Sequence, residues 1–90
     1  MPKFEWLNKQ GVKSDSGFVV QSTGRFTIEY SEGAKTLEVG VEAGFMGDKP
    51  VTSYSRSSFS KWSQDAKEQE RVIANFRQAL EFQGLVPIEH

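Results

Sequence analysis

Few side chains in this 90-residue chain could do chemistry, and three glutamates are the best candidates. Glu29 lies in a segment that alternates apolar and polar residues, and Glu38 and Glu42 lie in the next such segment. Alternation with a period of two places all three carboxylates on the solvent side of a predicted sheet. This face could in principle bind a cation, but a paired acid and base would need burial that it lacks. Solvated strand carboxylates are the simpler interpretation.

The remaining catalytic inventory is sparse. The sole histidine is His90, the last residue of the sequence, where chain mobility disfavours a catalytic base or a metal ligand. The sequence has no cysteine, which excludes disulfides, thiol catalysis and thiolate metal sites. It also lacks the phosphate-binding, dinucleotide-binding, serine-hydrolase and zinc-protease motifs. We therefore expect no enzyme activity, no cofactor and no metal.

Composition favours a globular domain. Hydrophobic residues make up 37% of the chain and charged residues 26%, and 90 residues are enough for one core. Eleven basic and twelve acidic residues leave a net charge of −1, without the basic tract of a nucleic-acid-binding protein. No apolar run approaches the roughly 18 residues that a membrane-spanning helix needs, and the first residues are too charged for a signal peptide. We expect one cytoplasmic domain, 1–90, that binds neither nucleic acid nor membrane.

The stretch 65–84 has the sustained periodicity of an amphipathic helix. Its apolar residues recur at the spacing of one helical face, at Val72, Ile73, Phe76, Ala79 and Leu80. Asp65 and Glu68 have the spacing of a capping box, in which the Asp carboxylate accepts from the Glu68 amide and the Glu carboxylate accepts from the Asp amide. Gly84 stands where a left-handed residue would end the helix.

The segment 17–54 has the pattern of an antiparallel β-meander. Apolar and polar residues alternate through most of it, and short turns containing glycine divide it. The most regular strand is predicted to turn one set of residues toward the core, namely Leu37, Val39, Val41 and Ala43. The predicted strands span 17–22, 25–30, 35–43 and 51–54.

Turn geometry predicts how the second and third strands pair. A four-residue loop at 31–34 would place Ile28 opposite Leu37 and Phe26 opposite Val39. The apolar faces of the two strands then coincide.

The first hairpin leaves two registers open. A two-residue turn would direct Val19 toward the core. A three-residue loop at 22–24, with Gly24 left-handed in a bulge, would direct Phe18 and Val20 inward instead. We prefer the second register because it buries the larger side chains against the next strand.

The flanking segments complete an α+β domain. The first 16 residues are predicted as an N-terminal segment and loop, in which 3–7 could form a short edge strand before a polar loop that runs from Asn8 to Gly17. Residues 55–64 are predicted as an ordered connection, because aromatic residues interrupt their serine run. Residues 85–88 can form a last strand, restricted to a sheet edge by Pro87. The expected fold is an antiparallel meander packed by one long C-terminal helix, with a short final edge strand.

Three further features could serve function or packing. Phe45 and Met46 lie between two glycines on a predicted loop at 44–49. They could form a binding surface, or Phe45 could equally fold down over the core. Trp62 is expected to pack against the helix and the sheet. Asn75 could bond a neighbouring loop or face solvent.

These features together predict a protein-binding surface. It combines the glutamates of the outer strand face with the 44–49 loop, and its residues are Glu29, Glu38, Glu42, Phe45 and Met46. In such a surface the apolar anchor slows dissociation and the charges speed encounter. The alternative is that the glutamates only keep the sheet soluble and protect it against edge pairing.

From Phe26 onward the chain resembles a known family. The segments that carry the resemblance are Ile28–Gly33, Ser58–Trp62, Arg71–Phe76 and Ala79–Gly84. Their order and spacing are similar to those of predicted immunity proteins of bacterial polymorphic toxin systems, the immunity protein seventy-four group. That group has a β-meander, a connection carrying a tryptophan, a C-terminal helix and a short last strand. A proline-rich acidic stretch commonly follows its tryptophan, whereas here Ser63-Gln64-Asp65 leads directly into the helix.

The resemblance implies a cytoplasmic protein that binds and neutralises a cognate protein toxin without catalysis of its own. The alternative hypothesis is an accessory or structural module that self-associates through a sheet edge. The expected state in solution is a monomer or a weak homodimer.

Overall fold

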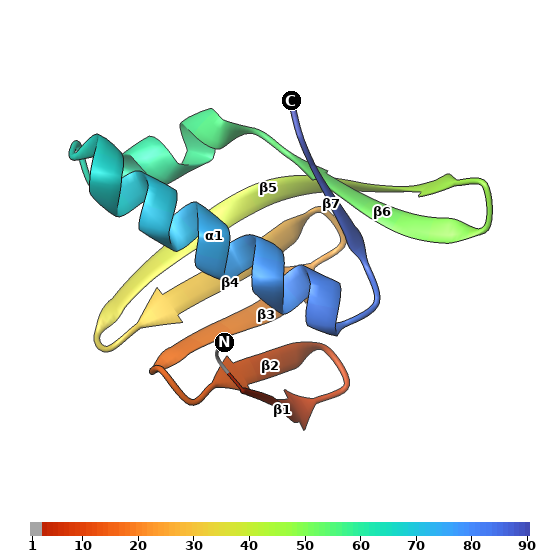
Figure 1. Cartoon of the computed structure of the whole chain (residues 1–90), viewed down its shortest axis with the longest axis horizontal. Helices are drawn as coiled ribbons and strands as arrows, with labels where there is room; N and C mark the ends of the chain where they lie inside the picture. The colour runs from red at the N-terminus through yellow and green to blue at the C-terminus, as the bar shows by residue number, and fades with distance from the viewer. Residues whose placement is uncertain (1–2) are drawn as a thin grey trace.

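The computed structural model describes residues 3–90, which form an α+β domain (Figure 1). Its seven strands make one curled sheet in which they follow chain order, from β1 at one edge to β7 at the other. Neighbouring strands are antiparallel except β6 and β7, which are parallel. The strands are β1 (Phe4–Asn8), β2 (Gly11–Ser14), β3 (Phe18–Gly24), β4 (Thr27–Glu32), β5 (Lys35–Met46), β6 (Lys49–Tyr54) and β7 (Val86–Glu89).

One long helix, α1 (Ala66–Phe82), lies across the inner face of the sheet (Figure 1). The predicted apolar stripe is confirmed, since all five of its residues are buried. Gly84 follows the helix with φ +84°, as predicted for a left-handed terminating residue. The capping box is wrong in its partners. Asp65 accepts from the amide of Lys67 at 3.0 Å, and Glu68 turns to other side chains.

The core between α1 and the sheet is strongly aromatic. Tyr54, Phe59 and Phe76 meet edge to face, with ring centroids 5.3–5.9 Å apart. Phe59 belongs to the short 3-10 helix η1 (Arg56–Lys61), so the 55–64 connection is ordered as predicted. Trp62 is 4% exposed, which confirms its core position. Edge-to-face packing of this kind adds stabilisation to the area buried.

The β4–β5 hairpin has the predicted faces but a different register. Its turn has two residues, 33–34, so that Glu32 pairs with Lys35. Tyr30 therefore lies opposite Leu37, and the predicted pairing of Ile28 with Leu37 is wrong. The slip is an even number of residues, which leaves each side chain on its predicted face.

The β3–β4 hairpin is also shifted. Phe18 and Val20 are buried, as the preferred register predicts, but Val20 pairs with Tyr30 and the turn lies at residues 25–26. The bulge next to Gly24 is present, whereas a left-handed conformation of that glycine is not. Phe26, predicted to face the core, is 62% exposed because it lies in the turn.

The two ends of the chain each add an edge strand. The predicted N-terminal edge strand is β1, but the polar loop predicted at 8–17 is wrong, because it contains β2 with Val12 and Ser14 buried. The predicted last strand is β7, which pairs only with β6 and carries Pro87. Within residues 3–90, no helix is long and apolar enough to cross a membrane.

Candidate protein-binding surface

The three predicted glutamates lie on the outer face of the sheet, opposite α1. Glu29 on β4 and Glu38 on β5 are direct cross-strand partners. Glu42 lies two outward positions further along β5, where it pairs with Ser53 of β6. We call these three carboxylates the acidic face. The structure therefore brings two of them side by side and places the third on the same strand, roughly 13 Å away at the rise of an extended chain.

The acidic face lacks compensating charge. Across residues 3–90, the structure shows no ion pair and no side-chain hydrogen bond for Glu29, Glu38 or Glu42. Like charges directly opposite each other in an antiparallel pair are destabilising. The arrangement is thus unfavourable for the isolated fold, and a cationic group from outside would relieve it.

Phe45 and Met46 belong to a strand rather than to a loop. They pair with Pro50 and Lys49, and the turn of the hairpin is the two-residue segment 47–48. Phe45 is 77% exposed and Met46 59%, so Phe45 does not fold over the core. Alternation along β5 places Met46 on the same side as Glu42 and places Phe45 on the helix side. The acidic face therefore has Met46 as its apolar neighbour.

A hollow adjoins the acidic face at the point where β4 leaves β5. Its lining includes Glu42 together with Phe26, Gly40, Ser53 and His90. Gly40 leaves it open, since a β-carbon added there would meet no atom within 4 Å. Sequence reasoning missed Phe26 and His90 at this place, because the first was expected in the core and the second had no predicted neighbour.

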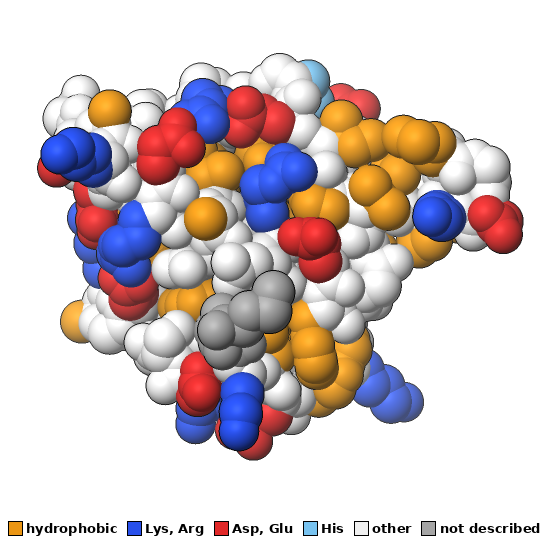
Figure 2. Space-filling view, in the orientation of Figure 1, with side chains coloured by type: hydrophobic (Ala, Val, Ile, Leu, Met, Phe, Trp, Pro, Cys, Tyr) orange, Lys and Arg blue, Asp and Glu red, His pale blue; other side chains and the backbone are white. Residues whose placement is uncertain are grey.

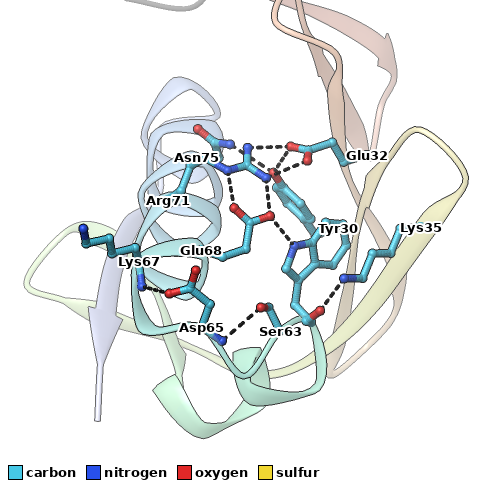
Figure 3. A network of polar contacts seen from close by, with 10 residues as sticks. Tyr30, Glu32, Lys35, Ser63, Asp65, Lys67, Glu68, Arg71 and Asn75 are labelled. Atoms are coloured by element: carbon cyan, nitrogen blue, oxygen red, sulfur yellow. Dashed lines mark hydrogen bonds and ion pairs between the residues drawn. The ribbon is translucent and has the colours of Figure 1, made fainter.

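The opposite side of the sheet carries a connected polar network centred on Arg71 (Figure 3). The Arg71 guanidinium donates to both carboxylate oxygens of Glu32, at 2.9 and 2.7 Å. It also donates to both carboxylate oxygens of Glu68, each at 2.8 Å. Paired donation of this kind fixes geometry as well as charge. Arg71 thereby ties α1 to the end of β4.

The network continues into the core through Tyr30. The Tyr30 hydroxyl donates to Glu32 at 3.0 Å, and the Asn75 side-chain amide donates to that hydroxyl at 3.0 Å. Asn75 thus contacts a strand residue, which neither predicted alternative had foreseen. Burial raises the pKa of Tyr30 to about 12, because the phenolate would lose its hydration.

Trp62 and Lys35 close the network near the start of α1. The Trp62 indole N–H donates to Glu68 at 3.3 Å. The Lys35 ammonium lies 4.4 Å from the centre of the Trp62 ring and also donates to the Trp62 carbonyl. Hydrogen bonds from Arg71, and then from Trp62, lower the pKa of Glu68 to about 2. The charged and polar groups of this network are paired with one another, so we assign it a structural role in holding α1 against the sheet.

Neither face supplies a recognisable metal-binding arrangement among the residues that the structure describes. No group of three or more histidine, aspartate or glutamate side chains in residues 3–90 could hold a metal ion. Comparison of the chain with protein-family models, curated proteins and solved structures found no match. The resemblance to immunity proteins therefore stays a prediction.

Proposed function

We propose that this chain is a non-catalytic protein-binding domain whose acidic face binds a basic surface of a protein toxin and so neutralises it. The toxin is suggested by the sequence resemblance to immunity proteins. The binding role is supported by the distribution of charge in the fold, and these two supports are independent.

The observation that carries the proposal is the contrast between the acidic face and the other carboxylates. Most of the others have a polar partner in the structure: Glu5, Asp15, Glu32, Asp65, Glu68, Glu70 and Glu89. The acidic face gathers three carboxylates for which residues 3–90 provide no such partner, two of them in direct opposition. Charge that costs stability and lies on one accessible face is suited to a partner of opposite sign.

Binding to such a face would use charge first and apolar contact second. The carboxylates would attract a basic surface and speed its encounter, an effect that weakens as salt rises. Met46 at the end of the same face, and Phe26 beside Glu42, are exposed apolar groups that could then exclude water. Self-association, the alternative role, would use strand backbone and does not compete for these carboxylates.

The test begins with the gene that neighbours the one for this chain. We expect it to encode a large secreted protein with a toxic C-terminal domain, whose expression in bacterial cells stops growth. Co-expression of the present protein should restore growth. The triple variant Glu29→Gln, Glu38→Gln, Glu42→Gln should restore it less well at equal protein level, whereas Glu81→Gln, on the helix, should act as the parent does. Full rescue by the triple variant would show that the binding surface lies elsewhere. If the parent protein gives no rescue, the proposal that it neutralises this toxin is refuted.

A further inference from the structure

β5 changes neighbours half-way along its length. Its first part, up to Gly40, pairs with β4, and its second part, from Val41, pairs with β6 on the other side. Beyond Gly40, the side of β5 that β4 had covered therefore has no neighbouring strand among residues 3–90. Figure 1 shows the consequence, a β5–β6 hairpin that extends past the β3–β4 turn.

The backbone groups on this open side can be assigned. In an antiparallel ladder, successive residues direct their N–H and C=O groups to opposite neighbours. The Val41 N–H donates to the Phe26 carbonyl at 2.8 Å, so odd-numbered residues of β5 face the β4 side. Ala43 and Phe45 accordingly direct their backbone groups past the end of β4, where no strand of residues 3–90 receives them.

The two terminal strands of the sheet have protected edges, whereas this part of β5 does not. β1 has an irregular register between Trp6 and Asn8, and β7 carries Pro87, which has no N–H. The open part of β5, by contrast, consists of Ala43, Gly44 and Phe45, without proline or charge. Hydrophobic side chains also lie exposed over the hairpin and β7 (Figure 2), Phe45 among the most exposed. An unprotected edge of this kind is a template for another strand.

We propose that the occupant is the same edge of a second copy of this chain, paired antiparallel about a two-fold axis at Phe45. In this register the Phe45 residues of the two copies form a hydrogen-bonded pair and their exposed rings become cross-strand neighbours. An axis at Gly44 would instead place Gly47 opposite Val41, a position that Phe26 of the same copy already occupies. With the axis at Phe45, Gly47 lies opposite Ala43, and Gly44 lies opposite Met46 at the close spacing of a non-hydrogen-bonded pair.

The charges of the two copies also match in this register. The hairpin turn of one copy, which carries Asp48, meets the β3–β4 turn of the other, which carries Arg25. Within residues 3–90 the structure shows no ion pair for either side chain. The two-fold axis makes this contact twice. Both acidic faces remain on the same side of the joined sheet and are not covered by the pairing. The dimer therefore does not depend on the proposed binding of a toxin.

Sedimentation equilibrium from micromolar to millimolar concentration tests the pairing. The apparent mass should rise from the monomer value of 10.1 kDa toward twice that value, because a short strand pairing gives a weak dimer. Ala43→Pro removes an edge N–H, and Phe45→Lys adds a charge that protects edges. Each should abolish the rise without lowering the melting temperature. Trp6→Lys, which makes the same kind of change at a half-exposed aromatic residue on the β1 edge, should leave dimerisation unchanged.

A charge exchange tests the register itself. Arg25→Asp and Asp48→Arg should each weaken dimerisation roughly tenfold, and the double variant should restore it. A mass that stays at the monomer value through millimolar concentration would refute the dimer. A dimer that survives Ala43→Pro, or a double variant no better than the single ones, would refute this edge or this register. Growth rescue in the toxin assay is a separate readout, so the two proposals can fail independently.

Discussion

The two faces of the sheet use the same residue type in opposite ways. On the helix side, Glu32 and Glu68 share one guanidinium, that of Arg71, in four hydrogen bonds of 2.7–2.9 Å. On the outer side, Glu29 and Glu38 face each other across two strands, and residues 3–90 provide no cation for them. The difference arises because α1 brings a positive charge to one face only. We infer that the helix side holds the fold together, and that the outer side is kept charged for a partner.

The largest expected effect comes from removing a phenylalanine ring from the core, and the same change at an exposed phenylalanine is its control. Phe76→Ala should lower the free energy of unfolding by about 3–5 kcal/mol, because the ring is fully buried between Tyr54 and Phe59. Phe45→Ala makes the same chemical change at a side chain that is 77% exposed, and should change stability by less than ~0.5 kcal/mol. Urea unfolding of both variants gives the comparison. Equal losses would show that the assignment of core and surface is wrong.

A smaller loss should follow when the cation of the helix side is removed. Arg71→Leu leaves Glu32 and Glu68 without the guanidinium that they share, and should lower the unfolding free energy by more than the loss of a single exposed ion pair, which is worth about 0.2–1 kcal/mol. Arg25→Leu is the matched control, because Arg25 has no ion pair within residues 3–90. It should cost less than ~0.5 kcal/mol. Similar costs for both arginines would contradict the network's structural role.

Acid should weaken the helix side through the same carboxylates. The pKa of Glu68 is lowered from 4.5 to about 2, and Arg71 also lowers the pKa of Glu32. Since both carboxyls bind protons more weakly when folded, their stabilisation is complete above pH 4.5 and is lost as the pH falls toward about 2. Thermal melts should therefore show stability falling across this interval. In Arg71→Leu that fall should be shallower, and an unchanged slope would contradict the assignment.

The smallest expected effect has the opposite sign. Glu38→Lys would place a positive charge opposite Glu29, and should raise the unfolding free energy by about 0.2–1 kcal/mol. Glu68→Lys, the matching change on the helix side, should lower it, because the new charge would face Arg71. Chemical denaturation of the two variants side by side measures both. Loss of stability in Glu38→Lys would contradict the view that Glu29 and Glu38 repel each other without compensation.

Sequence reasoning found the elements better than their partners. The α1 stripe was predictable because Val72, Ile73 and Phe76 recur with the period of one helix. Strand registers were not, since two- and four-residue turns preserve the same faces and differ only in pairing. β2 was missed because four residues with a central lysine carry too little alternation to separate a strand from a loop.

The two faces of the sheet also differ in how far the sequence predicts them. Alternation alone placed Glu29, Glu38 and Glu42 outward, and the structure agrees. The contact between Arg71 and Glu32 could not be predicted, because these residues are 39 positions apart in the sequence. They become neighbours only when α1 packs on β4. The position of Phe45 depended on the length of the hairpin turn, which the glycines on either side left undetermined.

The central claim, that the acidic face is kept for a basic partner, is tested most directly by association kinetics. The measurement is the association rate constant with the toxin domain at several salt concentrations, for the parent and for the Glu29→Gln, Glu38→Gln, Glu42→Gln variant. We predict association roughly tenfold slower at low salt, a weaker salt dependence and undiminished stability, because long-range attraction is lost while the fold is relieved of repulsion. Parental rates with a parental salt dependence would contradict the claim.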